Sequence, residues 1–276
     1  MKRSIIWLAS YPKSGNTWTR LFLANYLMNA QEPVPINQAH RFAVGDAVVK
    51  MYNRVAGREI DPTDLSLCLR LREGVLRGIV ANNADVNFVK THNARVAPEQ
   101  IDLIPDRYTR SAIYIIRNPL DMVLSYARHY GITQEDAAQK ICHPDNGNLP
   151  TETSVAQYLS TWDLHVKSWM AYAPWKRLIV RYEDLLDDPE THFAKVLDLV
   201  GVPVDKTRLQ RAIRFSSFDE LSRQEEEQGF IERPEQSEKF FGKGQKDQWK
   251  TDLDPALAEM IRSKMGETMK RYGYLE

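Results

Sequence analysis

The stretch of residues 11–18 combines a lysine, a glycine and several short polar side chains. It lies between an apolar run and a helical pattern, and such a turn suits an anion because backbone N–H groups and a helix N-terminus point at the ligand. Gly15 lets the backbone approach closely, and Lys13 supplies a point charge. The other donors in this stretch are Ser14, Asn16 and Thr17. These features predict a phosphate-binding loop, and the alternative is an ordinary strand–helix turn.

The order of residues in this loop separates it from the common nucleotide-triphosphate loop. That loop reads GxxxxGK[ST], whereas here the lysine precedes the glycine and no second glycine is present. A kinase or ATPase of the common kind is therefore disfavoured.

A second candidate anion site follows the apolar run at 112–116. Asn118 can cap a helix whose first residue is Pro119, which places Arg117 at the carboxyl end of a strand, where α/β folds bind ligands. An arginine suits a phosphate monoester because it donates two parallel hydrogen bonds. Ser125 lies two turns into the same helix. The alternative for Arg117 is a surface ion pair at a strand end.

Residues 11–18, Tyr-Pro-Lys-Ser-Gly-Asn-Thr-Trp, resemble the 5′-phosphosulfate loop of the cytosolic-type sulfotransferases, and Asn16 is the only departure from the family form YPKSGTTW. Three more segments are similar to family motifs in the expected order: Lys90-Thr91-His92, residues 117–125 and residues 241–250. The resemblance covers residues 4–272. It implies transfer of a sulfuryl group from 3′-phosphoadenosine 5′-phosphosulfate to a hydroxyl of a small-molecule acceptor.

The resemblance implies a role for each motif. His92 is the general base that takes the acceptor proton, and a histidine suits this task because its ordinary pKa is about 6.5. Lys13 and Lys90 stabilise charge on the sulfuryl group and on the leaving phosphate. The donor is bound by Lys13, Ser14, Gly15, Asn16, Thr17, Trp18, Arg117, Ser125, Tyr182, Ser217, Phe218, Lys243 and Gly244. No metal is required. A lone histidine is otherwise more often structural than catalytic.

The adenosine end of the donor is assigned to three aromatic residues. Phe218, in a segment similar to the family's adenosine-binding segment, is expected to stack on one face of adenine and Trp18 on the other. Tyr182 lies in a segment that resembles the family's YEDL motif. Ordinary core packing is the alternative for all three rings.

The 3′-phosphate end shows one departure from the family. Its expected ligands are Arg117, Ser125, Lys243 and Gly244. Gly242 stands where the family's RKGxxGDWK segment has an arginine, so one cationic contact is missing. We expect Lys239 or Lys246 to compensate.

Two segments rich in turn residues, 31–64 and 131–152, are expected to form lids over the acceptor. Their apolar and aromatic side chains suit a phenol, an aromatic natural product or a lipid-like or glycosylated alcohol. They include Phe42, Met51, Tyr52 and His143, with His129 and Tyr130 directly before the second segment. Simple lid packing is the alternative.

Four apolar runs at 5–9, 86–89, 112–116 and 178–180 are predicted to be buried strands. Helical patterns lie between them, and longer helices are predicted at 153–173, 189–200, 205–214 and 255–271. Strand–helix alternation predicts an α/β fold with a central parallel sheet flanked by helices, similar to P-loop nucleotide-binding folds and carrying lid insertions. We expect residues 1–276 to form a single domain.

Lys plus Arg and Asp plus Glu both number 37, so the net charge is zero. This excludes a generally basic nucleic-acid binder but not one local anion site. Two rival functions stay open: a catalytically silent nucleotide-binding module and an ATP-dependent phosphotransferase. Two cysteines, no secretory signal and no apolar run long enough to span a bilayer lead us to expect a cytoplasmic protein.

The oligomeric state is left open by the sequence. Lys250 and Glu259 keep the spacing of the family's dimer motif, but Asp254-Pro255 stands where Thr-Val is expected.

Overall fold

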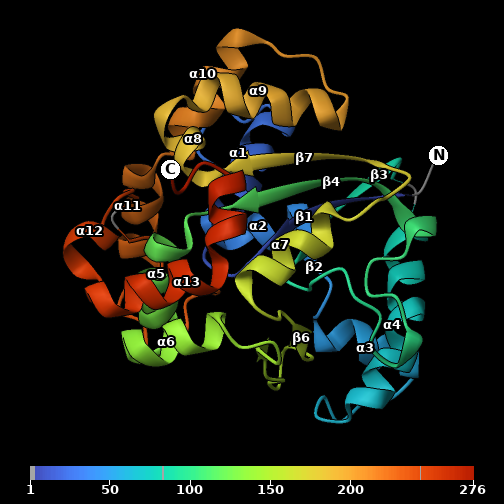
Figure 1. Ribbon diagram of the computed structural model, residues 1–276. Helices are drawn as coiled ribbons and strands as arrows, with labels where there is room; N and C mark the ends of the chain where they lie inside the picture. The colour runs from blue at the N-terminus through green and yellow to red at the C-terminus, as the bar shows by residue number, and fades with distance from the viewer. Residues whose placement is uncertain (1–3, 83, 243) are drawn as a thin grey trace.

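The computed structural model describes residues 4–82, 84–242 and 244–276. Its centre is a parallel sheet of five strands in the order β2-β3-β1-β4-β7 (Figure 1). The strands are β1 (Ser4–Ser10), β2 (Ala43–Gly45), β3 (Val86–Thr91), β4 (Thr109–Ile116) and β7 (Lys176–Arg181). The prediction of a central parallel sheet is confirmed, and each of the four predicted strands lies within an observed one.

Both faces of the sheet are covered, which explains the near-continuous apolar strands. In β1, Ile5 and Trp7 pack on one face, whereas Ile6 and Leu8 pack on the other, as a period of two requires. Every residue of β1 is buried.

Helices separate into two layers (Figure 1). One layer packs on the face of Ile6 and contains α1 (Asn16–Leu27), α2 (Ala39–Phe42), α8 (Tyr182–Asp187), α9 (Pro189–Val200), α10 (Lys206–Phe215) and α11 (Phe218–Gln228). The other packs on the face of Trp7 and contains α3 (Val49–Ala56), α4 (Leu65–Val80), α5 (Pro119–Tyr130), α6 (Gln134–Ile141), α7 (Trp162–Met170) and α13 (Pro255–Arg271). The short helix α12 (Trp249–Asp252) precedes α13.

The predicted helix at 153–173 is wrong in its first half. The chain there forms β6 (Gln157–Tyr158), which pairs antiparallel with β5 (Gly147–Asn148). The helix α7 begins only at Trp162, because Ser160 has a positive φ of 62° and the hydroxyl of Thr161 accepts a hydrogen bond from the N–H of Leu164.

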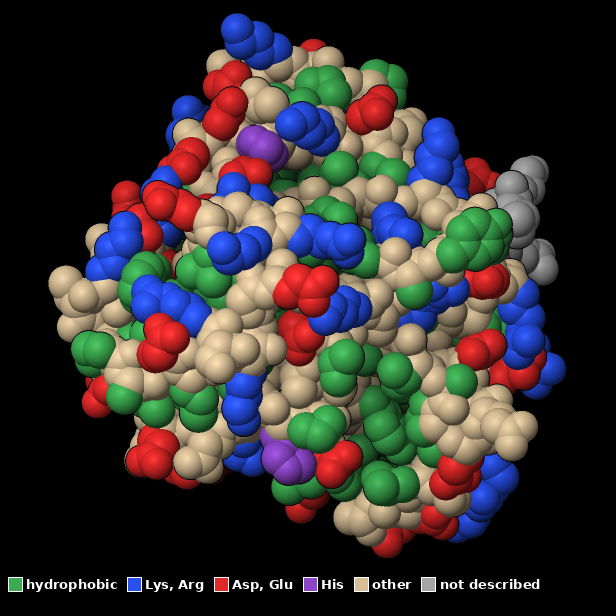
Figure 2. Space-filling view, in the orientation of Figure 1, with side chains coloured by type: hydrophobic (Ala, Val, Ile, Leu, Met, Phe, Trp, Pro, Cys, Tyr) green, Lys and Arg blue, Asp and Glu red, His purple; other side chains and the backbone are tan. Residues whose placement is uncertain are grey.

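Positive and negative side chains are interspersed on the face shown in Figure 2. This distribution agrees with the zero net charge of the sequence.

Candidate active site

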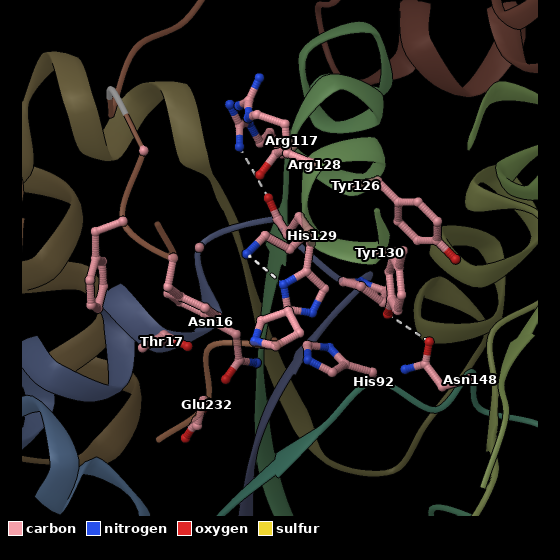
Figure 3. Close-up of a pocket in the computed structure, with 18 of the residues that line it drawn as sticks. Asn16, Thr17, His92, Arg117, Tyr126, Arg128, His129, Tyr130, Asn148 and Glu232 are labelled. Carbon is pink, nitrogen blue, oxygen red and sulfur yellow. Dashed lines mark hydrogen bonds between the residues drawn. The ribbon is translucent and has the colours of Figure 1, made fainter. Parts of the chain in front are cut away.

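The carboxyl ends of three neighbouring strands meet at one cavity of about 640 Å³ (Figure 3). Lys13 follows β1, Lys90 and His92 lie at the end of β3, and Arg117 follows β4. Parallel strands end at the same edge of a sheet, so segments far apart in the sequence converge there.

The loop after β1 is shaped for an anion. Gly15 stands at the N-cap of α1 with φ 102°, and no side chain caps the first turn of this helix. The amide of Asn16 is held by a 2.8 Å hydrogen bond from its Nδ2 to the carbonyl of Leu8. The buried oxygens Ser14 Oγ and Asn16 Oδ1 have no hydrogen-bond partner within the described residues. An uncapped helix N-terminus with unpaired polar atoms is the arrangement that a phosphate or sulfate group completes.

Two glycines allow close approach at this site. A Cβ at Gly15 would lie 2.8 Å from Cδ2 of Tyr182, and a Cβ at Gly244, whose φ is 57°, would collide with the ring of Phe218. Both positions therefore require glycine for space as well as for conformation.

Lys13 is surrounded by other cations. Its ammonium donates a 3.5 Å hydrogen bond to Nδ1 of His129 and lies 3.9 Å from the centroid of the Phe240 ring. Burial together with Arg117, Lys90 and further positive charge lowers the pKa of Lys13 to about 7. An anion that neutralises these charges stabilises the protonated lysine.

Arg117 lies between the phosphate loop and the C-terminal segment. Its Nη1 donates to the carbonyl of Lys13 at 3.1 Å, and its Nη2 donates to the carbonyl of Gln245 at 3.5 Å. The guanidinium lies 4.4 Å from the centroid of the Tyr182 ring, while its buried Nε has no partner in the described part of the chain. Arg117 is therefore held by hydrogen bonds to two carbonyl oxygens, and its Nε can still donate a hydrogen bond to a ligand.

His92 has a defined tautomer. Its Nδ1 lies 2.9 Å from the carbonyl oxygen of Ser10. A carbonyl oxygen only accepts, so Nδ1 carries the proton and Nε2 keeps its lone pair. Burial and the neighbouring Lys90 hold the pKa of His92 well below its usual range. The imidazole is therefore neutral at pH 7 and able to accept a proton at Nε2.

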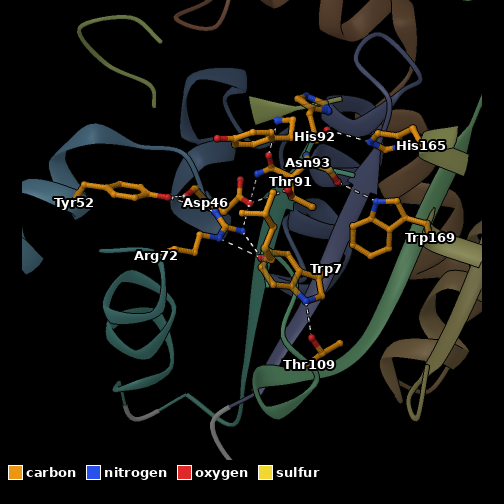
Figure 4. Close-up of polar contacts among 12 residues, drawn as sticks. Trp7, Asp46, Tyr52, Arg72, Thr91, His92, Asn93, Thr109, His165 and Trp169 are labelled. Carbon is orange, nitrogen blue, oxygen red and sulfur yellow. Dashed lines mark hydrogen bonds and ion pairs between the residues drawn. The ribbon is translucent and has the colours of Figure 1, made fainter. Parts of the chain in front are cut away.

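A buried polar network fixes the backbone on both sides of His92 (Figure 4). Thr91 Oγ1 donates to Oδ2 of Asp46 at 2.7 Å, and Asn93 Nδ2 donates to the same oxygen at 3.1 Å. Arg72 pairs with Oδ2 of Asp46 at 2.7 Å, and both side chains are buried. The residues on both sides of His92 are thus held by one ion pair in the core.

His165 supports His92 from the opposite side. Its Nε2 donates to the backbone carbonyl of His92 at 3.0 Å, and its Nδ1 accepts a 2.8 Å hydrogen bond from the hydroxyl of Tyr114. Burial lowers the pKa of His165 to about 4, so this ring stays neutral.

Trp18, Tyr182 and Phe218 form an aromatic cluster at one end of the cavity. The centroids of Trp18 and Phe218 are 5.2 Å apart, and the rings are tilted by 57°. A base sandwiched between two rings needs a separation of about 7 Å, twice the contact distance. The expected sandwich is therefore not open in this structure, although all three rings border the cavity.

Most of the donor-binding residues that the sequence predicts line this one cavity. Those that do are Lys13, Gly15, Asn16, Thr17, Trp18, Arg117, Ser125, Tyr182, Phe218 and Gly244, together with Lys90 and His92. Ser14 is fully buried beside the lining, and the hydroxyl of Ser217 accepts a hydrogen bond from the N–H of Glu220 as the cap of α11. Lys243 lies outside the described residues.

The expected substitutes for the missing arginine at Gly242 do not reach the cavity. Lys239 pairs with Glu226 on the surface, and Lys246 pairs with Asp187. Instead, Nη2 of Arg128 lies 4.0 Å from the position that a Cβ at Gly242 would take, and Arg128 lines the cavity. One signal in the sequence could have identified this residue, because Arg128 lies one helical turn after Ser125.

Only one of the two expected lids covers the site. Residues 131–152 line the cavity at positions that include Ile132, Lys140, Asn148 and Leu149. Residues 31–64 do not line it: they supply β2, α3 and the buried Asp46. Of the six expected acceptor residues, only His129 and Tyr130 border this cavity.

The β5–β6 hairpin is tied to the segment that carries the base. The N–H of Tyr158 donates to Oδ1 of Asn93 at 2.8 Å, and the N–H of Ala94 donates to the carbonyl of Tyr158 at 2.7 Å. A third bond joins the N–H of Val155 to the carbonyl of Ala47 at 2.8 Å.

Two negative findings complete the description. The described residues contain no group of three or more His, Cys, Asp or Glu side chains that could hold a metal ion. Within the same residues, no helix is long and apolar enough to cross a membrane.

The fold and this cavity define an α/β protein that binds an anionic ligand at the carboxyl ends of parallel strands. A family model described as "Sulfotransferase domain" matches residues 3–273, so the chain belongs to the sulfotransferase family. The resemblance inferred from the four motifs is thereby confirmed, and the chain is a sulfotransferase.

Curated relatives agree with this assignment. "Cytosolic sulfotransferase 12" of Arabidopsis thaliana is 24% identical, and the match covers 99% of this chain and 79% of the relative. "Flavonol 3-sulfotransferase" of Flaveria bidentis is also 24% identical, with 95% and 82% covered.

Solved structures show the same fold. Mouse sulfotransferase SULT7A1 complexed with PAP has a TM-score of 0.62 at 20% identity, covering 99% of this chain and 90% of the other. Retinol dehydratase in complex with androsterone and inactive cofactor PAP has a TM-score of 0.66 at 17% identity, covering 98% and 82%.

Proposed function

We propose that this chain, as a single domain, transfers a sulfuryl group from 3′-phosphoadenosine 5′-phosphosulfate to a hydroxyl of a small-molecule acceptor. The observation that carries the proposal is the convergence of Lys13, Lys90, His92 and Arg117 on one cavity, with Nε2 of His92 free to accept a proton.

The reaction needs one base and several cations. As the acceptor oxygen forms its bond to sulfur, its proton passes to Nε2 of His92. The bond between sulfur and the bridging oxygen breaks, and its electron pair stays on the 5′-phosphate. Lys13 and Lys90 stabilise the negative charge on the sulfuryl and bridging oxygens. The incoming anionic donor also raises the low pKa of His92, which makes the imidazole a stronger base when the substrates are present.

Arg117 and Arg128 are assigned to the 3′-phosphate. Both line the cavity, and the pKa of Arg128 is lowered by burial and by Arg117 (Figure 3). Two guanidinium groups that repel one another are stabilised by a dianion between them. In this assignment, Arg128 replaces the arginine that the family carries at the position of Gly242.

The part of the cavity assigned to the acceptor is lined by aromatic rings and by amide side chains. Tyr126, Tyr130 and Phe240 supply apolar surface, and the amides Asn148 and Gln157 supply donors and acceptors. This lining supports a phenol or an alcohol with further polar groups. Named relatives act on flavonols, and one related structure holds androsterone.

A cytoplasmic location is also proposed, and the name of the Arabidopsis relative supports it.

The test is a transfer assay with radiolabelled donor over a panel of phenols, steroids and flavonols. We expect labelled product with at least one acceptor class and tight binding of 3′-phosphoadenosine 5′-phosphate (the bisphosphate). ATP serves as the comparison ligand. Tight ATP binding with no transfer from the sulfated donor would reject the proposal.

A further inference from the structure

Glu232 is the one carboxylate among the described residues that line the cavity. It lies on the irregular segment after α11, next to Asn16 and Thr17 of the phosphate loop in the view of Figure 3. Its side chain is 22% exposed, so it is largely withdrawn from water. A carboxylate in a cavity built for a polyanion weakens donor binding unless its charge is balanced.

Arg20 balances that charge from the helix of the phosphate loop. Its Nη1 donates to Oε1 of Glu232 at 2.9 Å, and its Nη2 donates to Oε2 at 2.6 Å. The Arg20 side chain is only 1% exposed, and its Nη2 also donates to Oγ1 of Thr17 at 2.9 Å. The pair is therefore anchored to the first turn of α1, next to the loop.

Lys90 is the second partner of Glu232. Its ammonium lies 3.5 Å from Oε2 of the carboxylate, and its side chain is 25% exposed. Arg20 holds Oε2 in position, so this oxygen fixes where the Lys90 ammonium lies. Lys90 is two residues from His92, and both border the cavity.

We propose, resting on the proposed function, that Glu232 is a positioning residue for sulfuryl transfer. Its carboxylate, fixed by Arg20, keeps the Lys90 ammonium charged and directed at the transferring group. Arg20 neutralises Glu232 so that the carboxylate does not repel the donor.

The electrostatics of Lys90 give the expected pH dependence. Burial lowers the pKa of Lys90, the neighbouring Glu232 and the more distant Asp46 raise it, and Arg20 lowers it again. The other titratable groups that interact with this ammonium are Lys13, His92 and His129. Removing the carboxylate therefore lowers this pKa further, and Lys90 loses its proton at a lower pH.

Glu232→Gln tests this role directly. We expect the alkaline limb of the kcat profile to move to lower pH by about one unit, with kcat at pH 9 about tenfold below wild type. Binding of the bisphosphate should stay the same or tighten, because one negative charge is lost. The matched control is Glu226→Gln, an exposed carboxylate paired with Lys239, which should change neither quantity.

A second variant tests the role of Arg20. Arg20→Met leaves Glu232 without its main partner, and we expect the Kd for the bisphosphate to rise about tenfold or more. Adding Glu232→Gln to that variant should restore binding of the bisphosphate, because it removes the unbalanced negative charge, although it changes a second residue of the pair. A purely structural role for the pair predicts no such rescue.

The proposal is overturned if Glu232→Gln keeps the wild-type pH profile, if it loses kcat equally at every pH, or if the double variant binds no better than Arg20→Met. Should Arg20→Met fail to fold, the pH profile of Glu232→Gln alone decides. Absence of any transfer by the wild-type protein would instead reject the proposed function, and the binding rescue would still report on the Arg20–Glu232 pair.

Discussion

Replacing Arg128 by methionine tests the donor site with a change confined to one cation. The guanidinium of Arg128 makes no hydrogen bond to any described residue, whereas Lys239 and Lys246 are already paired with carboxylates. Methionine keeps much of the side chain's apolar volume and removes the charge. Any loss of affinity then reports on the anion that the guanidinium meets.

The expected magnitude follows from the charge of the contact. A hydrogen bond to a charged group contributes about 1.5–3 kcal/mol, and each 1.4 kcal/mol is about tenfold in Kd. Arg128→Met should therefore raise the Kd for 3′-phosphoadenosine 5′-phosphate by about 10- to 150-fold. Titration calorimetry at low salt measures it, because salt screens partly exposed charges.

A second substitution, at Gly242, should restore the affinity for the bisphosphate. A Cβ at Gly242 would meet only Nη2 of Arg128, at 4.0 Å, so a side chain can begin there without a clash. Arg128→Met combined with Gly242→Arg should recover most of the affinity. Lys239→Met is the matched control and should stay within about twofold of wild type. An unchanged Kd in Arg128→Met, with the fold intact by circular dichroism, would refute the assignment of Arg128 to the 3′-phosphate.

Three further predictions concern the base, the loop lysine and the core ion pair. His92→Ala should lower kcat by about 10²- to 10⁴-fold while bisphosphate binding stays within a few-fold, and turnover close to wild type would remove His92 from the role of base. The pKa of Lys13 is about 7 in the free protein, and the anionic ligand raises it, so binding takes up a proton. Affinity for the bisphosphate should therefore fall as pH rises above 7, by up to about tenfold per pH unit, and a Lys13→Met variant with the same slope would contradict this. Asp46→Asn leaves the buried Arg72 without its counter-ion and should lower the free energy of unfolding by about 3–5 kcal/mol in urea titrations, whereas the exposed control Asp198→Asn should change it little.

The sequence was sufficient for the sheet and for the position of the loop between β1 and α1, because both depend on local patterns. The apolar runs of β1 and β4 are buried, those of β3 and β7 are largely half-buried, and the loop follows β1 directly. The strand β2 was missed because its three residues, Ala43–Gly45, carry too short a pattern to distinguish from a lid.

Residues that act through distant partners could not be found in this way. Glu232 and Arg20 are separated by 212 positions, and only the fold shows that they form a pair. Asp46 was placed in a lid by its turn-rich neighbours, yet its carboxylate holds Thr91 and Asn93 beside the base. The first part of the helix expected at 153–173 instead contains the hairpin strand β6, whose backbone groups bond to Asn93 and Ala94.

The β5–β6 hairpin lines the cavity on the side assigned to the acceptor. Hydrogen bonds from its backbone join this hairpin to the side chain of Asn93 and to the backbone of Ala94 and Ala47, so it is tied to the segment that carries His92. Asn148 and Gln157 project from a backbone whose position is set by the segment that carries the base. Under the proposed function, exchanging these two side chains is expected to alter which acceptors fit, which makes them entry points for redesigning acceptor preference.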